Sequence, residues 1–406
     1  MLNISVWGSL ELHHYPDALA VVRATAPDQP VILNRPHAAA RAARFFVEKF
    51  PGRSLYAVKA NPSPDLLRAL WDAGVTHYDV ASIAEVRLVR EILPEAVLCF
   101  MHPVKTPSAI TEAYQQHGVR VFSLDCLDEL EKIKEATGNA EDLTLCVRLR
   151  VSSDYSELSL ASKFGCDLTE AGELLQATRQ VADSLGVCFH VGSQSMSPHA
   201  YVQALERVRA AIVDASVLVD IIDVGGGFPS IYPGMEPPPL EDYFGVIDRT
   251  YESLPVSYSA ELWCEPGRAL CAEYNSLIVR VERRRGNELY INDGAYGALF
   301  DAAHVGWRFP VKLLRDGTEE TTPYSFYGPT CDDMDHMEGP FELPEDMKSG
   351  DYIEIGMLGA YGAAMKTGFN GFGETIVHEV SDEPMASQYR GDRRDPRVSD
   401  NVVSLR

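Results

Sequence analysis

Residues 219–224 read Val-Asp-Ile-Ile-Asp-Val and lead directly into three glycines, Gly225, Gly226 and Gly227. A short and mostly apolar run is typical of a parallel strand that is covered on both faces. Seven more runs of this kind occur in the chain, at residues 54–59, 76–80, 97–101, 119–124, 143–149, 187–191 and 258–264. Together the eight runs indicate a protein built around a buried parallel sheet.

Helical segments with their own start and stop signals separate these runs. Ser63 and the proline after it supply an N-cap and a first helical residue, and Gly74 marks the end of that helix. Thr106 and Gly118 repeat the pattern. Eight strand–helix repeats over about 230 residues match a closed (β/α)8 barrel better than an open doubly wound sheet. We therefore predict an α/β fold with a TIM-like barrel over residues 28–268.

The secondary structure that the sequence predicts changes after residue 268. Turns there separate strand-like runs at residues 277–282, 288–292, 310–314, 322–326, 351–355 and 376–380, with little helical periodicity. This pattern predicts a second, mostly antiparallel β-sandwich or β-barrel domain, made of residues 1–27 and 269–381. Residues 382–406 are polar and have no apolar face, so we expect a flexible tail.

Composition excludes several classes of protein. The 406 residues carry 36 Lys and Arg against 59 Asp and Glu, and the resulting charge of −23 disfavours nucleic acid and anionic membranes as partners. It favours a small cationic substrate instead. The chain shows no run of about 18 apolar residues and no secretory signal. The eight cysteines are scattered without a Cys-x-x-Cys pair, which predicts reduced thiols, a cytoplasmic location and no metal site.

Residues whose side chains could bind a cofactor or take part in catalysis follow several of the predicted strands. Lys59 ends the first strand, where an amine that is partly removed from water is a candidate for covalent attachment to an aldehyde. The three glycines after residue 224 and Arg268 after the last strand suit a phosphate group. Glu265 adds a carboxylate at the same end. An amine, a phosphate site and a partner for a pyridine nitrogen are what pyridoxal phosphate requires.

His190 and Ser193 follow the sixth strand of the predicted barrel. An imidazole at this position could lie against a flat cofactor ring, and the Ser193 hydroxyl could donate to the phosphate. A core histidine that is satisfied by a backbone carbonyl is the alternative interpretation of His190 taken alone.

A set of motifs extends these interpretations and resembles one known family. The chain is similar to the fold-type III pyridoxal-phosphate decarboxylases, the alanine-racemase-like group that acts on ornithine, lysine, diaminopimelate and arginine. The resemblance runs in order from about Val31 to Phe372. Its motifs are YAVKAN at 56–61, HVGS at 190–193, DVGGGFP at 223–229, EPGR at 265–268, GPTCD at 328–332 and GAY at 359–361.

The resemblance implies a role for each matched residue around the cofactor. Lys59 would hold the aldehyde, Glu265 would pair with the ring nitrogen, and His190 would stack on the ring. The phosphate would be bound by Ser193, Gly225, Gly226, Gly227, Gly267, Arg268 and Tyr361. Further pocket residues would be Asp79, Glu85 and Arg148.

The resemblance also implies a homodimer whose active sites lie at the subunit interface. Cys331 would be contributed across that interface as the acid that returns a proton to the substrate carbon. Asp332 and Asp301 match carboxylates that meet the distal ammonium of a diamino acid, and Tyr296 belongs to the same pocket. An apolar substrate would leave these carboxylates unpaired and would be rejected.

These residues predict a lyase of polyamine biosynthesis that converts L-ornithine to putrescine and CO₂, with L-lysine to cadaverine as a second reaction. Cys331, His190, Lys59 and Glu265 would carry the chemistry. The alternatives are a diaminopimelate decarboxylase, an amino-acid racemase on the same fold, and a catalytically inactive homologue that acts as a binding protein. A Cys-Glu-Ser sequence at the Cys331 position would favour diaminopimelate, whereas this chain has Cys-Asp-Asp.

Overall fold

The computed structural model describes residues 13–151, 154–158 and 162–389. The chain divides into two compact units. We call Ala40–Ile231 with Met235–Cys271 and residues 388–389 the barrel unit. We call residues 13–39, Tyr232–Gly234 and Ala272–Ser387 the β unit.

The barrel unit contains a closed parallel barrel of eight strands, which confirms the predicted fold class. Each strand pairs in parallel with the next, and the last strand pairs with the first, so the sheet has no edge. The strands in barrel order are β3 (Arg53–Ala57), β4 (His77–Val80), β5 (Val97–Phe100), β6 (Val121–Leu124), β7 (Thr144–Arg148), β9 (Ser184–Cys188), β11 (Ile221–Asp223) and β12 (Glu261–Cys264).

Apolar side chains fill the space enclosed by these strands. Leu55, Cys99, Cys146, Cys188 and Trp263 belong to this buried cluster. Burial raises the pKa of the three thiols well above its usual range, so they remain protonated. All eight cysteines of the chain are free, and six of them are buried, as expected for thiols that serve as small apolar side chains.

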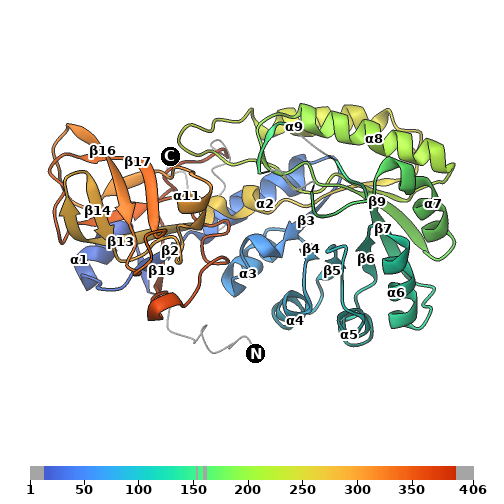
Figure 1. Ribbon diagram of the computed structural model, residues 1–406, viewed down its shortest axis with the longest axis horizontal. Helices are drawn as coiled ribbons and strands as arrows, with labels where there is room; N and C mark the ends of the chain where they lie inside the picture. The colour runs from blue at the N-terminus through green and yellow to red at the C-terminus, as the bar shows by residue number, and fades with distance from the viewer. Residues whose placement is uncertain (1–12, 152–153, 159–161, 390–406) are drawn as a thin grey trace, which may run out of the picture. The chain divides into compact units, whose positions relative to one another are not determined.

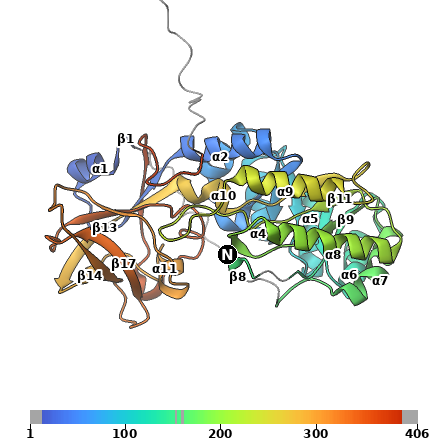
Figure 2. The ribbon, with the colours of Figure 1, turned by 90° about the horizontal axis from the view of Figure 1, so that it is seen from above.

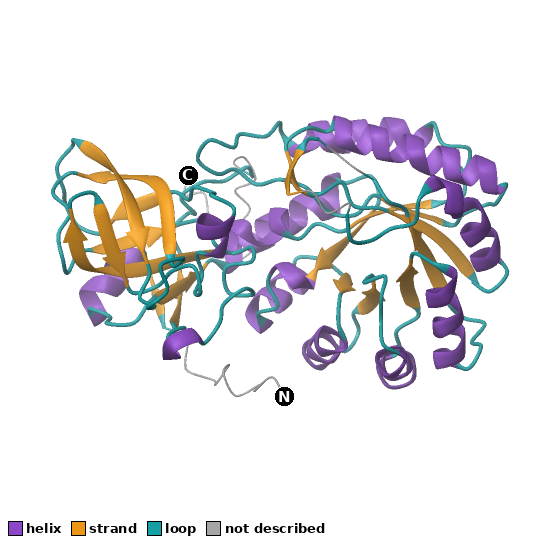
Figure 3. Ribbon diagram, viewed as in Figure 1, coloured by secondary structure: helices purple, strands orange, loops and turns teal. Residues whose placement is uncertain are grey.

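Helices surround the barrel strands on the outside (Figures 1 and 3). Thr106 Oγ1 accepts the Ala109 amide at the start of α5, and Gly118 ends this helix with φ of 68°. Helices α8 and α9 lie side by side (Figure 2). The helices that follow one another along the chain are α2 (Pro36–Lys49), α3 (Pro64–Asp72), α4 (Ile83–Ile92), α5 (Pro107–His117), α6 (Leu127–Thr137), α7 (Leu168–Arg179), α8 (His199–Ala215) and α9 (Leu240–Glu252).

The β unit is built on a mixed sheet of nine strands. The long strand β13 (Asn275–Arg285) pairs antiparallel with three neighbours. The path of the sheet runs through β1 (His14–Tyr15), β19 (Ile376–Val380), β2 (Val31–Asn34), β13, β14 (Glu288–Ile291), β16 (Thr321–Tyr327) and β17 (His336–Pro344), with β18 (Tyr352–Ile355) beside β13 and β15 (Val311–Leu313) beside β18.

Two features of the β unit differ from the sequence prediction. Strand β17 was not predicted, because Gly339 and Pro340 interrupt its alternation of apolar and polar residues. Strand β2 lies in the β unit although residues 28–268 were predicted as barrel. The reason is its pairing, since Val31 lies opposite Ile278 of β13 and Ile376 of β19.

Two side chains within the predicted tail make specific contacts. Asp382 lies 2.9 Å from Arg35, which is buried and also pairs with Glu354 at 2.8 Å. Tyr389 is only 4% exposed, and its hydroxyl donates to the Ala269 carbonyl at 2.6 Å. The remainder of the predicted tail, residues 390–406, lies outside the described residues.

Across residues 13–151, 154–158 and 162–389, no helix is both long and apolar enough to cross a membrane. In the same ranges, no three histidine, cysteine or acidic side chains gather as a metal site would require.

Candidate active site

Lys59 and Asp79 form an ion pair at the carboxyl end of the barrel. Strand β3 ends at Ala57, and the short turn η2 (Val58–Ala60) carries Lys59 directly beyond it. Lys59 Nζ lies 2.7 Å from Asp79 Oδ2. The Asp79 side chain is 2% exposed and that of Lys59 is 40% exposed. The amine is therefore held in place by a buried carboxylate while it remains accessible.

Glu85 lies beside this pair, in the first turn of α4. Its carboxylate accepts the Ala81 amide at 2.7 Å, and the Ser82 side chain in turn accepts the Glu85 amide. The Ser82 bond caps the start of the helix, and the Glu85 bond satisfies the amide of the residue before the cap. Burial raises the pKa of Glu85, and the nearby Asp79 raises it further.

The three glycines after β11 pass so close to their neighbours that no side chain fits. A Cβ atom on Gly225 would lie 1.9 Å from the Phe189 carbonyl oxygen, and one on Gly227 would lie 2.5 Å from the Gly192 carbonyl oxygen. Gly225 and Gly227 also have positive φ angles, of 68° and 101°. A Cβ on Gly226 would lie 2.9 Å from His190 Nε2, so this loop closely approaches the histidine ring.

Arg268 and Ser193 place hydrogen-bond donors near this loop. Arg268 begins the short helix α10 (Arg268–Cys271), is 5% exposed, and donates to Ser193 Oγ at 3.5 Å. Ser193 belongs to the short strand β10 (Ser193–Ser195), which pairs with β8 (Ser156–Leu158). A guanidinium, a hydroxyl and a glycine loop that leaves room for an anion fit the phosphate of the predicted cofactor.

His190 follows β9 and is neutral. Its Nδ1 accepts the Gly192 amide at 3.0 Å, which leaves Nε2 to carry the hydrogen. Burial lowers the pKa of His190 well below its usual range, and Arg148 and Lys59 lower it further. Arg148 ends β7, and its guanidinium lies 5.5 Å from the centre of the Phe164 ring.

Glu265 and Asp223 form a buried pair of carboxyl groups at the ends of adjacent strands. The Glu265 amide donates to the Gly225 carbonyl at 2.8 Å, and the Gly225 amide donates to Asp223 Oδ1 at 2.8 Å. Burial and the nearby Asp223 raise the pKa of Glu265 well above its usual range. Burial raises the pKa of Asp223 to about 6. A cationic group beside Glu265 would relieve this repulsion, as a protonated pyridine nitrogen would.

Sequence reasoning assigned no role to Asp223, although the residue stands in the motif of residues 223–229. The signal that could have identified it is an acidic residue at the end of a buried strand. Such a residue needs a partner, because an unpaired charge is costly there.

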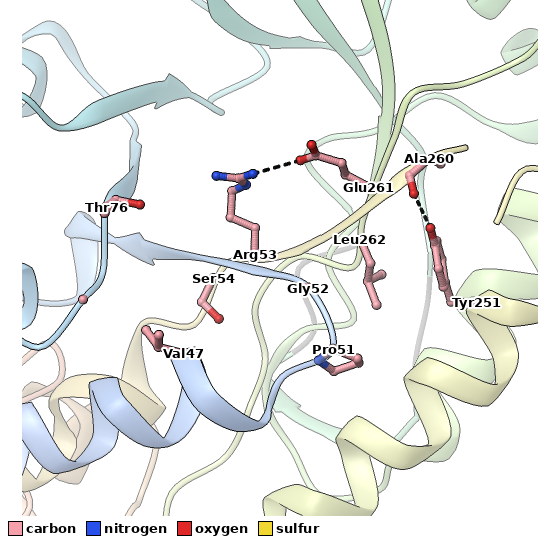
Figure 4. A pocket seen from close by; sticks show the side chains of 11 residues that line it. Val47, Pro51, Gly52, Arg53, Ser54, Thr76, Tyr251, Ala260, Glu261 and Leu262 are labelled. Carbon is pink, nitrogen blue, oxygen red and sulfur yellow. Dashed lines mark hydrogen bonds and ion pairs between the residues drawn. The ribbon is translucent and has the colours of Figure 1, made fainter. Parts of the chain in front are cut away.

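A separate pocket lies at the opposite end of the barrel (Figure 4). It is lined by the first residues of β3 and β12, Arg53 and Glu261, whose side chains pair at 3.3 Å. Tyr251 donates to the Ala260 carbonyl at its rim. None of the predicted site residues lines this pocket, and enzymatic sites of barrels occupy the other end of the strands.

The predicted substrate residues lie on loops of the β unit. Tyr296 donates its hydroxyl to Asp332 Oδ2, and Asp332 Oδ1 accepts the Met334 amide at 3.0 Å. These two bonds lower the pKa of Asp332, the Tyr296 bond being the stronger cause, so the carboxylate is ionised. The Cys331 amide donates to Asn370 Oδ1 at 3.1 Å, and the Cys331 side chain is exposed.

Asp301 and Tyr361 also belong to the β unit. Asp301 lies in the first turn of α11 (Phe300–His304), and its carbonyl accepts the amides of Val305 and Trp307. Tyr361 has a positive φ of 63°, which is uncommon for a side chain of this size. The structure thus gathers the predicted cofactor residues of the barrel at one rim and brings Tyr296 to Asp332. The joining of the two sets remains a prediction.

Comparison with known proteins relates this chain to one family. A model described as "Pyridoxal-dependent decarboxylase, pyridoxal binding domain" matches residues 37–272. A lysine/ornithine decarboxylase of Selenomonas ruminantium is 32% identical over 344 residues, which cover 81% of this chain and 84% of the relative. Antizyme inhibitor 2 of Xenopus laevis is 31% identical over 358 residues, covering 80% of this chain and 75% of the relative.

A solved structure agrees with these sequence relatives. The arginine decarboxylase of Paramecium bursaria Chlorella virus, bound to agmatine, superposes with a TM-score of 0.80 at 28% sequence identity. The match covers 89% of this chain and 98% of the viral chain. The similarity therefore extends over both units of the chain.

Proposed function

The chain belongs to the pyridoxal-dependent decarboxylase family, and from that premise we propose that it removes the α-carboxylate of L-ornithine to give putrescine and CO₂. L-Lysine, which would give cadaverine, is the proposed second substrate. The observation that carries this proposal is the ionised Asp332 directly after Cys331, held by the Tyr296 hydroxyl. A carboxylate in this position suits the distal ammonium of a diamino acid.

The residues at the barrel rim fit pyridoxal phosphate, the cofactor of the family. Lys59 would hold its aldehyde, and Glu265 would face its ring nitrogen. His190 would lie against the ring, where a neutral imidazole adds no charge. The phosphate would be held by Ser193, Gly225, Gly226, Gly227, Gly267, Arg268 and Tyr361, and the pocket would be completed by Asp79, Glu85 and Arg148.

When bound, the cofactor supplies an electron sink for the electron pair that remains when CO₂ departs. Side chains of the protein would transfer the protons and stabilise the charges that accompany the loss of CO₂. Asp79 Oδ2 can accept a proton from Lys59 Nζ across their 2.7 Å contact, which would free the amine for covalent chemistry. The Glu265 carboxylate would stabilise positive charge at the ring nitrogen, and Cys331 Sγ would return a proton to the substrate α-carbon.

Asp332, Asp301 and Tyr296 would select the substrate. Two carboxylates around one ammonium suit a diamino acid that has a single α-carboxylate. Tyr296 would orient Asp332 and keep it ionised. A substrate without the distal charge would leave these groups desolvated and unpaired, which is a strong basis for rejection.

We further propose a homodimer in which Cys331 acts on the cofactor of the partner subunit. In the single chain, the Cys331 side chain is exposed, and several large apolar side chains of nearby loops are also exposed. Exposed apolar groups of this kind mark interaction surfaces. They are Met334, Met365, Phe369 and Phe372. The free cysteines fit a cytoplasmic location.

L-Arginine is an alternative to these two substrates, because the superposed viral structure is an arginine decarboxylase bound to agmatine. A diaminopimelate decarboxylase and an amino-acid racemase remain as the alternatives predicted from the sequence. A binding protein without activity is a further alternative, since one relative is named as an antizyme inhibitor. The complete set of cofactor residues at the barrel rim weighs against loss of activity.

Steady-state CO₂ release by the holoprotein from ornithine, lysine, arginine and diaminopimelate, measured side by side, tests the proposal. The expected result is the highest kcat/KM for ornithine, followed by lysine. A higher value for arginine or diaminopimelate would overturn the proposed substrate. Release from none of the four, with loss of optical purity in recovered substrate, would indicate a racemase instead.

A further inference from the structure

The loops that carry Cys331, Asp332 and Tyr296 converge on one buried carboxylate, that of Asp335. Asp335 is 1% exposed although the residues before it in the loop are partly or fully exposed. Its Oδ1 accepts the Ala295 amide at 2.7 Å. Its Oδ2 accepts the Thr330 amide at 3.0 Å and the Thr330 hydroxyl at 2.7 Å. One side chain therefore joins two loops that are about 35 residues apart in the sequence.

Each donor to Asp335 stands next to a residue of the proposed substrate site. Ala295 precedes Tyr296, and Thr330 precedes Cys331. The Tyr296 hydroxyl reaches back to Asp332, which closes a ring of contacts between the two loops. The backbone reinforces this ring, because the Asp335 amide donates to the Asp332 carbonyl at 3.0 Å and the Gly328 amide donates to the Asp335 carbonyl at 2.8 Å.

The carboxylate also packs directly against the backbone of both loops. A Cβ atom on Gly294 would lie 2.1 Å from Asp335 Oδ1, and one on Gly328 would lie at the same distance from this oxygen. Both positions therefore require glycine for reasons of space. A longer side chain than aspartate would not fit, and an asparagine would place NH₂ hydrogens against groups that are themselves donors.

We propose that Asp335 is a positioning residue that fixes Cys331 Sγ and the Asp332 carboxylate relative to Tyr296. Its consequence for turnover rests on the proposed function, whereas its structural effect does not. The three donated hydrogen bonds are made to an ionisable group and are shielded from water, which makes them strong and directional. Without the Asp335 carboxylate both loops would be free to move. A displacement of about 1 Å at a reacting group can lower the rate about 100-fold.

Asp335→Asn tests this proposal against Asp333→Asn, which removes the same charge from an exposed position in the same loop. Asparagine replaces one of the two oxygens by NH₂, so the amide of either Ala295 or Thr330 loses its acceptor, and hydrogen exchange at that amide should become at least about tenfold faster in Asp335→Asn. Exchange in β11 should not change. In the holoprotein, kcat/KM should fall about 100-fold relative to Asp333→Asn.

Two substitutions at Thr330 keep the test decisive if Asp335→Asn does not fold. Thr330→Val removes the hydroxyl donor with little change of shape, and Thr330→Ser keeps it. We expect Thr330→Val to lower kcat/KM about tenfold and Thr330→Ser to restore it to within about twofold of the original.

Three results would overturn the proposal: loop exchange in Asp335→Asn that equals that of Asp333→Asn, equal kcat/KM in these two variants, or equal impairment of both Thr330 variants. If the unaltered holoprotein releases no CO₂ from any basic amino acid, the proposed function fails. The exchange measurement still decides the role of Asp335 in that case, since it needs no turnover.

Discussion

The barrel rim and the loops of the β unit present their chemical groups in opposite ways. At the rim, Asp79, Glu265 and Arg268 are each less than a tenth exposed; Asp79 lies in β4, Glu265 follows β12 and Arg268 begins α10. In the loops, Cys331 is exposed and Asp332 is partly exposed, although Asp335 in the same loop is buried. This difference fits the proposals that one chain supplies the cofactor site and that a second subunit encloses the substrate site.

The largest effect should come from the rim. Lys59→Ala removes the amine that would hold the cofactor aldehyde, so kcat should fall about 1,000-fold or more. The visible absorbance of the bound cofactor should be lost with it. Lys49→Ala, at an exposed helix end, is the control and should change neither. Unaltered turnover in Lys59→Ala would break the assignment of the rim as the cofactor site.

The corresponding substitution in the loops, Asp332→Asn, should weaken substrate binding and leave cofactor binding unchanged. Asp332→Asn keeps the shape of the side chain and an acceptor for Tyr296, but it removes the charge. We expect kcat/KM for ornithine to fall about 100-fold, or about 2.7 kcal/mol, mainly through KM. Cofactor absorbance should be unaffected. Equal losses in Asp332→Asn and the exposed Asp333→Asn would contradict a specific role for Asp332.

Mixing two inactive variants tests whether the barrel rim and the loops of one active site come from different subunits. Lys59→Ala and Cys331→Ala, mixed and allowed to exchange subunits, should recover about a quarter of the original activity, since half of the dimers then contain one intact site. Lys59→Ala mixed with Glu265→Ala is the control, because both changes lie on the barrel. Recovery is not expected there. Equal recovery in both mixtures, or none in the first, would contradict the shared site.

A smaller effect is expected on the free energy of unfolding, through a carboxyl group in a loop of the β unit. Burial raises the pKa of Asp293 from 3.8 to about 6 in the folded protein. Between these values the folded state binds the additional proton, so the free energy of unfolding falls as pH rises through this window. At about 1.4 kcal/mol per pH unit, the loss approaches 3 kcal/mol by pH 7. Asp293→Asn should remove it, because a neutral amide does not titrate.

Chemical denaturation of the cofactor-free protein at pH 4 and pH 7 measures this difference. The stability of Asp293→Asn relative to the unaltered protein should rise with pH. Asp333→Asn, at an exposed carboxyl group, should show no such rise. A constant difference between Asp293→Asn and the unaltered protein would contradict the burial of a titrating carboxyl group in this loop.

The sequence allowed the barrel to be predicted because its signals are local. Each strand is a short apolar run, and the glycines, Lys59 and Arg268 follow strand ends, which parallel pairing brings to one rim. The eight predicted strands overlap the eight observed ones, with boundaries that differ by a few residues. The apolar residues within each segment carry this information, so no long-range contact had to be known.

The loops of the β unit lack such local signals. Tyr296 and Asp332 were identified through motif resemblance, and nothing in their spacing predicts that one donates to the other. Asp335 was not assigned a role, because its partners are an amide 40 residues away and a threonine in its own loop. Strand β17 was also missed, since Gly339 and Pro340 interrupt the apolar and polar alternation of its sequence.

The most direct test of the account is to find where the cofactor is attached. Holoprotein treated with borohydride, which fixes a lysine-bound aldehyde to its amine, can be digested and analysed by mass spectrometry. We expect one modified lysine, Lys59, and no modification in the Lys59→Ala variant. Cofactor fixed to a different lysine, or to none, would contradict it.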